Sequence, residues 1–216
     1  MLNQLSFKGQ WRQYQQRVLD KSESFMDDGK IHLVAAPGSG KTTLGIEFIR
    51  RFGNTTLILV PTVTIRQQWV DRIKQAFLSD ANQAEQLISQ DLKRPKMITV
   101  ATYQALHSAM NQVVGDGLIE DTDDTAQQEH FNFQDFDIRK TFEDKDLGTL
   151  CLDECHHLRN EWWKSLDIFR KSFPKIKMIS LTATLHTREN LHFGSVTSAC
   201  VVRLMKKLQC LNWLRK

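Results

Sequence analysis

The stretch from Ile31 to Leu44, with the sequence IHLVAAPGSGKTTL, constrains the fold more than any other part of the chain. A short apolar run is followed by a proline and two glycines, and Lys41 then opens a helical pattern. A strand, a glycine-rich turn and a helix N-terminus in this order are typical of a phosphate-binding loop. Gly38 and Gly40 let the backbone turn its N–H groups inward, which forms a concave nest for a polyphosphate. The alternative is an ordinary glycine-rich turn with a surface lysine.

The side chains around these glycines suit ATP and Mg²⁺ as cofactors. Lys41 would reach the β- and γ-phosphates as a point charge, and Thr42 would offer its hydroxyl to Mg²⁺. The usual pattern has glycine at the first position of the loop, where this chain has Ala35. We expect the whole turn to contact the nucleotide, which adds Pro37, Ser39 and Thr43 to the candidate ligands.

The chain alternates strand and helix patterns, which predicts an α/β fold with a mostly parallel sheet and helices on both faces. Each predicted strand is short and nearly continuously apolar, as expected when helices cover both faces of the sheet. The expected strands are 31–35, 55–60, 96–102, 149–152 and 177–182, and the expected helices are 10–28, 41–52, 63–77, 103–114 and 160–173.

A pair of acidic residues follows the strand predicted at 149–152, in the sequence TLCLDECHH. Open α/β sheets build their sites at the carboxyl ends of strands. Asp153 is placed to hold Mg²⁺, and Glu154 to orient a water and take its proton. The two acids could also be plain loop residues, but the phosphate loop favours a site. His156 and His157 have no third ligand at a zinc-like spacing, so we favour a hydrogen-bonding role for His156.

Charge is unevenly distributed along the chain. The window from Gly115 to Gly148 holds eleven acidic and three basic residues, so the remainder carries 26 basic and 14 acidic residues. That basic excess suits a partner with a phosphate backbone, although many basic surfaces are only solvated. The acidic window is predicted to be a long surface insertion, partly disordered.

Two further patterns bear on the compartment. No apolar run approaches the roughly 20 residues that a membrane span needs, and the N-terminus lacks the apolar core of a signal peptide. We therefore expect a cytoplasmic protein with no membrane partner. The four cysteines have no CxxC spacing, so we expect reduced thiols at Cys151, Cys155, Cys200 and Cys210 rather than disulfides or a zinc site.

Six blocks, in order along the chain, resemble the first motor lobe of superfamily-two helicases and translocases. This group holds the DEAD/DEAH-box and DExH-type ATPases, including the motor subunits of restriction enzymes. The blocks are RQYQQ at 12–16, AAPGSGKTT, VPTVTIRQQW at 60–69, ATYQAL at 101–106, DECHH and SLTATL at 180–185. The resemblance implies a RecA-like P-loop NTPase domain over residues 1–185, with the acidic insertion at 115–148.

For the nucleotide site, the resemblance implies that Gln15 reads the adenine edge and that Arg12 lies against the base or the ribose. The stretch is rich in glutamine, so a plain polar helix face is the alternative. Thr182 and Thr184, together with His156, would couple the nucleotide state to the nucleic-acid groove. The strand of the two threonines would lie between the phosphate-loop strand and the acidic strand. The residues carried over to the triphosphate, the metal and the attacking water are Gly38, Gly40, Lys41, Thr42, Asp153 and Glu154.

For the nucleic-acid partner, DNA is favoured over RNA. The resemblance places Pro61, Thr62, Arg66 and Gln67 at the phosphates of one strand, with Thr102, Tyr103 and Gln104 continuing the track. For Arg66 a solvated helix face is an equal alternative. Trp69 and the pair Trp162 and Trp163 could be stacking platforms, but aromatics at helical spacing favour the core.

The family splits ATP between two RecA-like lobes, and the second lobe supplies an arginine finger. About thirty residues follow Leu185, too few for another lobe, so a second lobe would come from another chain. The basic tail at 186–216, with apolar residues at helix spacing from Val201, is either a short amphipathic helix or an unselected tail left by a truncated or frame-shifted gene. The rival functions are a binding module without turnover and an inactive fragment. A phosphotransferase would not explain the IRQQW, DECHH and TAT blocks.

Overall fold

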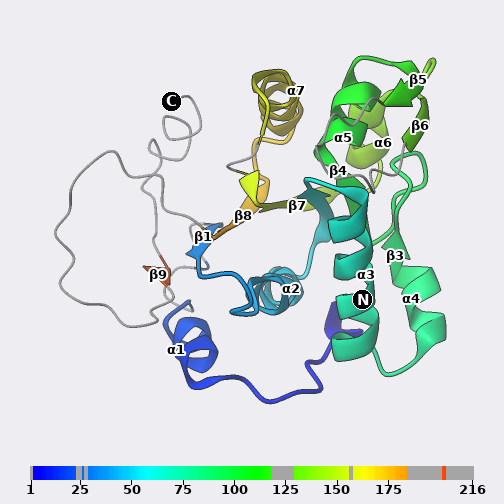
Figure 1. Cartoon of the computed structure of the whole chain (residues 1–216). Coiled ribbons are helices and arrows are strands. Elements are labelled where there is room, and N and C mark those ends of the chain that lie inside the picture. The colour runs from blue at the N-terminus through cyan, green and yellow to red at the C-terminus, as the bar shows by residue number, and fades with distance from the viewer. Residues whose placement is uncertain are drawn as a thin grey trace, which may run out of the picture.

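A seven-stranded sheet forms the centre of the molecule (Figure 1). The computed structural model describes residues 2–22, 26, 29–117, 129–155, 158–183 and 201–202. The strands are β1 (Lys30–Val34), β2 (Thr55–Val60), β3 (Ile88–Ser89), β4 (Ile98–Thr102), β5 (Val114–Gly117), β6 (Glu129–Asn132), β7 (Leu147–Asp153), β8 (Lys177–Thr182) and β9 (Val201–Val202). The helices are η1 (Leu2–Gln4), α1 (Gln13–Ser22), α2 (Lys41–Phe52), α3 (Val63–Phe77), α4 (Ala81–Leu87), α5 (Tyr103–Met110), α6 (Ile138–Glu143) and α7 (Asn160–Lys171).

The strand order of this sheet is β3-β4-β2-β7-β8-β1-β9. Every neighbouring pair is parallel except β1 with β9, which is antiparallel. Parallel pairing brings the carboxyl ends of β1, β2, β4, β7 and β8 to one edge of the sheet. The prediction that the threonine strand β8 lies between the phosphate-loop strand β1 and the acidic strand β7 is confirmed.

Two hydrophobic cores lie on the two faces of the sheet. In β2 the side chains alternate: Ile58 and Val60 belong to one core, and Leu57 and Leu59 belong to the other. The first core is shared with α1, α2 and α3, and the second with α5, α6 and α7. Figure 1 shows α1 and α2 below the sheet and α5, α6 and α7 above it. Helices therefore cover both faces, as the apolar strands predicted.

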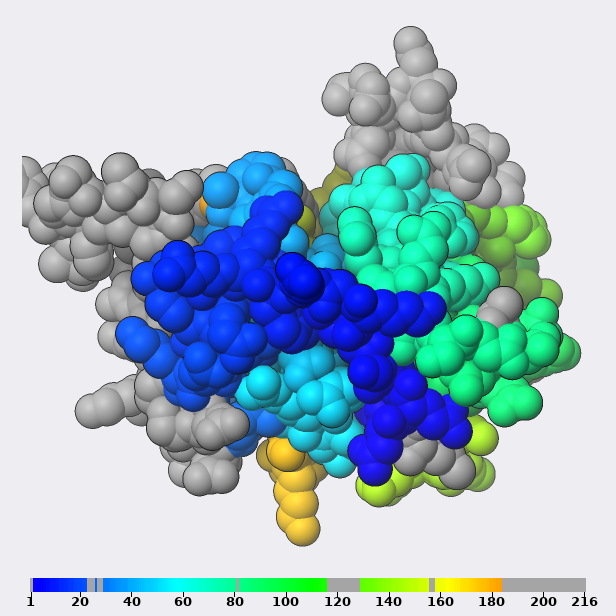
Figure 2. Space-filling model, turned by 90° about the horizontal axis from the view of Figure 1, so that it is seen from below, coloured from blue at the N-terminus to red at the C-terminus, as the bar shows by residue number. Residues whose placement is uncertain are grey.

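The N-terminal segment crosses the face formed by α1, α2 and α3, where Figure 2 shows it in dark blue. The N–H groups of Ser6 and Lys8 donate to the carbonyl oxygens of Phe77 and Ala76 at the end of α3, over 2.9 Å each. The Phe7 ring lies 4.1 Å from that of Trp11 and 5.3 Å from that of Phe77, between centroids. These contacts bring the start of α1 close to the phosphate loop.

Most predicted elements are present, with ends that local capping explains. Strand β2 and helices α2 and α3 have the predicted bounds, because Gly53 ends α2 in a left-handed conformation and the Thr62 hydroxyl caps α3. The helix predicted at 10–28 is shorter, since α1 covers only Gln13–Ser22. Helices α4 and α6 and strands β3, β5 and β6 were not predicted.

The prediction that residues 115–148 form a surface insertion is wrong for the second half of that window. Phe131, Phe133, Ile138 and Phe142 are buried and belong to the second core. Their spacing, first alternating and then helical, brings one apolar side of β6 and α6 against α5 and α7. Residues 118–128 lie outside the described part of the chain.

The tail and the cysteines are described only in part. The helix predicted from Val201 is wrong at its first two residues, because Val201 and Val202 form β9 beside β1. Cys151 and Cys155 are buried, reduced thiols, whereas Cys200 and Cys210 lie outside the described residues. Within the described residues, none of the helices has the length and apolar character needed to cross a membrane.

Candidate nucleotide-binding site

The turn between β1 and α2 has the conformation of a phosphate nest. Gly38 and Gly40 have positive φ angles of 72° and 91°, which favour glycine. Gly40 is the N-cap of α2 and no side chain caps it, so N–H groups of the first helical turn remain available to a ligand. The buried hydroxyl of Ser39 also has no hydrogen-bond partner among the described residues. This donor set suits a polyphosphate.

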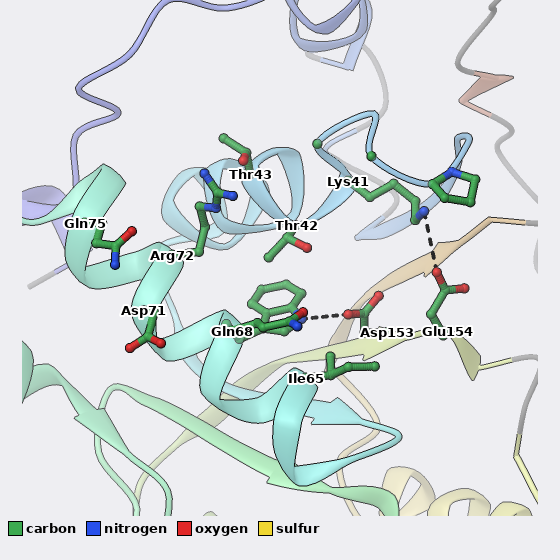
Figure 3. A pocket seen from close by; sticks show the side chains of 14 residues that line it. Lys41, Thr42, Thr43, Ile65, Gln68, Asp71, Arg72, Gln75, Asp153 and Glu154 are labelled. Carbon is green, nitrogen blue, oxygen red and sulfur yellow. Dashed lines mark hydrogen bonds and ion pairs between the residues drawn. The ribbon is translucent and has the colours of Figure 1, made fainter. Parts of the chain in front are cut away.

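Lys41 connects the turn to the acidic strand. Its side chain is nearly buried, and Nζ donates to the carbonyl oxygen of Ala35 over 3.0 Å. The same Nζ lies 3.5 Å from Oε1 of Glu154 (Figure 3). Glu154 accepts a second contact at Oε2, from the N–H of Ala183 over 3.1 Å. The predicted ammonium and the predicted water-activating carboxylate therefore lie in one pocket.

Asp153 forms the floor of this pocket at the end of β7. Its Oδ2 accepts a 2.7 Å hydrogen bond from Nε1 of the buried Trp69, and its backbone oxygen accepts one of 2.9 Å from Oη of Tyr103. The pKa of Asp153 is raised to about 6, and burial is the largest cause. The Trp69 hydrogen bond acts in the opposite direction, and the charge of Glu154 adds to the rise. A carboxylate whose charge is costly to bury suits a divalent cation.

Glu154 has a φ angle of 47°, in the left-handed region that non-glycine residues rarely adopt. Its backbone N–H donates to the carbonyl oxygen of Leu181 on β8 over 2.9 Å, and this bond holds the turn. Unusual backbone at the end of a central strand is common in functional sites. The strained turn directs the Glu154 carboxylate toward Lys41.

Helix α3 supplies the opposite wall of a cavity of about 510 Å³ (Figure 3). Four polar side chains of this wall were missed by the sequence analysis, although they recur three and four residues apart along the predicted helix. That spacing indicates a polar stripe, but the packing of α3 against α2, which turns the stripe toward the phosphate loop, involves distant segments. These residues are Gln68, Asp71, Arg72 and Gln75, and they face Thr42, Thr43 and Pro37.

The N-terminal residues predicted to bind the base instead contact the backbone of the phosphate loop. Gln15 is buried; its Nε2 lies 3.4 Å from the carbonyl oxygen of Ser39, and its Oε1 accepts a 3.0 Å hydrogen bond from the N–H of Arg12. Nη1 of Arg12 donates to the carbonyl oxygen of Gly38 over 3.4 Å. Both side chains therefore lie beside the loop, and adenine recognition stays a prediction.

The residues predicted to track nucleic acid lie at the ends of β2 and β4. Thr62 caps α3 by accepting from the N–H of Ile65 over 3.2 Å, and the exposed Gln67 donates to Asp71 over 2.8 Å. Arg66 and Thr102 both contact the carboxylate of Glu129. Tyr103, in contrast, is 2% exposed, so its side chain supports Asp153 and offers no open surface to a polymer.

The coupling residues are only partly described. Thr182 is buried at the end of β8, beside Val34 of β1, and its carbonyl oxygen accepts from the N–H of Ala35 over 3.1 Å. It thus adjoins both the phosphate loop and the acidic strand, as predicted for the middle strand. His156 and Thr184 lie outside the described residues.

ATP and Mg²⁺ fit the residues present. The nest offers main-chain N–H groups and the Lys41 ammonium to phosphate oxygens. Thr42 and Asp153 line the same cavity and supply the oxygen ligands that Mg²⁺ prefers. The cavity is large enough to hold a nucleotide.

Comparisons with known proteins agree with this geometry. A family model described as type III restriction enzyme, res subunit, matches residues 8–187. A relative named Rad25 from Halobacterium salinarum is 28% identical over 150 residues, which are 69% of this chain and 20% of that protein. DNA 3'-5' helicase XPB of Mycobacterium tuberculosis is 28% identical over 192 residues, which are 88% of this chain and 29% of that protein. The chain thus spans less than a third of each of these relatives.

The crystal structure of the UvsW helicase from bacteriophage T4 has a similar fold. The TM-score is 0.52 at 14% sequence identity, over 86% of this chain and 57% of that chain. The mostly parallel sheet with helices on both faces is therefore the predicted α/β, RecA-like fold.

Proposed function

The chain belongs to the family of the type III restriction enzyme res subunit, and from this membership and the pocket geometry we propose that it is the ATP-binding motor lobe of a helicase or translocase. The observation that carries the proposal is the convergence of Lys41, Asp153 and Glu154 on one cavity at the end of the phosphate-loop strand. Lys41 comes from the phosphate loop and the two acids from the DECHH block, and the three together match the needs of phosphoryl transfer.

In this proposal the phosphate loop binds the triphosphate. The N–H groups of the first turn of α2 and the Lys41 ammonium take the phosphate oxygens, and the ammonium exchanges its contacts with Ala35 and Glu154 for them. Thr42 and Asp153 would hold Mg²⁺, which would neutralise charge on the phosphates. Gln15 and Arg12, whose side chains contact the loop backbone, are the proposed contacts to the base or the ribose.

Glu154 is the proposed general base. With Lys41 engaged by phosphate, the Glu154 carboxylate retains the N–H of Ala183 as a donor and can accept a proton from an attacking water. The N–H of Glu154 donates to the carbonyl oxygen of Leu181 on β8, so a shift of the Glu154 turn would bear on the end of β8 at Thr182. This supports a coupling role for Thr182.

Nucleic acid is the proposed polymer, with DNA favoured over RNA because the relatives from Halobacterium salinarum and Mycobacterium tuberculosis are named as DNA 3'-5' helicases. The ends of β2 and β4, with Thr62, Arg66 and Thr102, are the proposed contact to its phosphates. A second RecA-like lobe would complete the catalytic site with an arginine finger, so we expect slow hydrolysis by this lobe alone.

The first test is nucleotide binding. We expect Lys41→Ala to lower ATP affinity roughly 10- to 100-fold, the loss of a charge-assisted contact, in isothermal titration calorimetry. Lys145→Ala, which removes an exposed ammonium from the turn before β7, is the matched control and should bind like wild type. Equal ATP affinity of Lys41→Ala and wild type would overturn the nucleotide site.

The second test separates a motor from a binding module. We expect single-stranded DNA to stimulate ATP hydrolysis, and Glu154→Gln to abolish the stimulated rate while leaving ATP binding intact. ATP and DNA binding without stimulated turnover would favour the module.

A further inference from the structure

The carboxylate of Glu129 contacts both Arg66 and Thr102, two of the residues predicted to contact phosphates of nucleic acid, at the ends of β2 and β4. Oε1 of Glu129 pairs with Nη1 of Arg66, and Oε2 accepts a 2.9 Å hydrogen bond from Oγ1 of Thr102. Glu129 lies 63 residues from Arg66 and 27 residues from Thr102 in the sequence, so the contact belongs to the tertiary fold. The two oxygens of one anion are thus held by a guanidinium and a hydroxyl.

The surroundings of this carboxylate form an anion site. Strands β2 and β4 are parallel neighbours with Val60 beside Thr102, so helices α3 and α5 begin at the same edge of the sheet. Thr102 also caps α5 by accepting from the N–H of Ala105 over 3.0 Å. Helix N-termini attract negative charge, and they add to the charge of Arg66.

Arg66 retains a donor for a further acceptor. Its side chain is 17% exposed, and its buried Nε has no hydrogen-bond partner among the described residues. A guanidinium, a hydroxyl and a helix N-terminus are the groups with which proteins hold backbone phosphates of nucleic acid. A tetrahedral phosphate would use the same donors as the planar carboxylate.

We propose that Glu129 occupies the position of a backbone phosphate, so that nucleic acid must displace it from Arg66 and Thr102 to bind. This inference rests on the proposed function and adds a residue that sets the affinity for the polymer. Glu129 opens β6, whose pairing with β5 can persist while the side chain rotates away. The Glu129 carboxylate and the incoming phosphate therefore compete for the same donors, Arg66 and Thr102.

The test is fluorescence anisotropy with a labelled 12-nucleotide oligothymidylate, without ATP, over a series of salt concentrations. We expect Glu129→Gln to bind about 3- to 10-fold more tightly than wild type at low salt, because the amide competes weakly for the guanidinium. The dependence of log affinity on log salt should also steepen by up to about one, as one more phosphate is neutralised.

Glu143→Gln is the matched control. It removes one negative charge from the same acidic window, but Glu143 lies exposed on α6 and makes no side-chain contact with Arg66. We expect it to bind like wild type or up to twofold more tightly. An equal gain in Glu129→Gln and Glu143→Gln would show a general charge effect and overturn the competition.

Two further variants complete the cycle. Arg66→Gln should weaken binding, and adding Glu129→Gln to it should restore nothing, because the two changes act on one contact. Unchanged or weaker binding by Glu129→Gln alone would also overturn the inference. If wild type and every variant fail to bind DNA while ATP still binds through Lys41, the nucleic-acid part of the proposed function fails and the inference falls with it.

Hydrogen exchange on the wild-type protein gives a readout that does not depend on any variant. Saturating oligothymidylate should speed exchange of the β5–β6 amides, since the hairpin loses its side-chain anchor on Arg66 and Thr102. Unchanged or stronger protection of these amides in the saturated complex would contradict displacement of Glu129.

Discussion

The indole Nε1 of Trp69 donates a 2.7 Å hydrogen bond to Oδ2 of Asp153, and both side chains are buried. This bond joins α3 to the carboxyl end of β7 across the floor of the candidate pocket. Trp69 is predicted to lie in the core, and it does. Its one polar atom also orients Asp153, the candidate metal ligand. Core packing and site geometry therefore depend on the same side chain.

Trp69→Phe should lower the free energy of unfolding by about 2–4 kcal/mol. The change removes a hydrogen bond to a charged acceptor and leaves a partial cavity in a fully buried site. Urea unfolding followed by circular dichroism measures the loss. Trp163→Phe is the control, because Trp163 is only partly buried and packs at the edge of the second core. A loss no greater than that of Trp163→Phe would contradict the role of the hydrogen bond.

Asp153 should make the stability of the metal-free protein depend on pH. Burial raises its pKa from 3.8 to about 6, with the Trp69 hydrogen bond and Lys41 acting in the opposite direction. A raised carboxyl pKa means that the ionised form destabilises the fold. The full cost, at most about 3 kcal/mol, is therefore present above pH 6 and disappears as the pH falls through the ordinary pKa.

Asp153→Asn should therefore be more stable than wild type at pH 8 and equal to it near pH 4, because an amide oxygen still accepts from the indole. Thermal unfolding in the presence of EDTA across this pH range measures the difference. Asp144→Asn, at an exposed position after α6, is the control and should be as stable as wild type at pH 8. A destabilised Asp153→Asn at pH 8 would contradict the buried charge.

Particular residues show which helices and strands could be predicted from the sequence. Strand β2 and helix α3 were predictable to the residue, because an unbroken apolar run ends at Pro61 and the Thr62 hydroxyl then caps the helix. The short helix α4, ANQAEQL, was missed because it has few apolar residues and its start depends on the Asp80 cap. Strand β6 and helix α6 were not predicted because the acidic residues around them indicated a surface segment. The spacing of Phe131, Phe133 and Phe142, which are buried in the second core, is the signal that indicates them.

Some contacts of the candidate site could be predicted from the sequence, and others could not. Parallel strands bring their carboxyl ends together whatever their side chains, so the meeting of Lys41 with Glu154 was predictable from the motifs. The polar stripe of α3 and the Trp69–Asp153 bond depend on how α2 and α3 pack, which local pattern does not specify. The pairing of Arg66 with Glu129 is of the same kind, since it joins segments 63 residues apart.

The two glycines of the phosphate loop should differ in their tolerance of alanine. A Cβ at Gly38 would meet nothing within 4 Å, so Gly38→Ala carries only the cost of a positive φ, about 1 kcal/mol. A Cβ at Gly40 would lie 2.6 Å from Nε2 of Gln15 and would displace that side chain from the Ser39 carbonyl. Gly40→Ala should therefore lose more stability in thermal unfolding without nucleotide. Equal losses would mean that Gln15 moves aside freely.

A buried carboxylate on α2 fixes the helix that carries Gln15. Glu47 is 4% exposed and accepts hydrogen bonds from Nε and Nη2 of Arg50, over 2.9 and 2.6 Å, and from Nε of Arg51 over 3.0 Å. Arg51 in turn donates through Nη1 to the carbonyl oxygen of Leu19 in α1 over 3.0 Å. The position of α1 beside the phosphate loop thus depends in part on Glu47.

Glu47→Gln should lower the free energy of unfolding at pH 7 by about 1–3 kcal/mol, because two partly exposed guanidinium groups lose the buried carboxylate that pairs with them. Burial raises the pKa of Glu47, but its bonds to Arg50 and Arg51 outweigh burial and the net shift is downward. The stabilisation is therefore present at neutral pH and fades as the pH falls below 4.5, where variant and wild type should converge in urea unfolding.

Asp167→Asn tests the same arrangement on α7, where the carboxylate pairs with Arg170 and Lys171 but is 20% exposed. Water screens that cluster, so its loss should stay below about 1 kcal/mol. Equal losses at the two sites would mean that the contact of Arg51 with α1 contributes nothing to the fold.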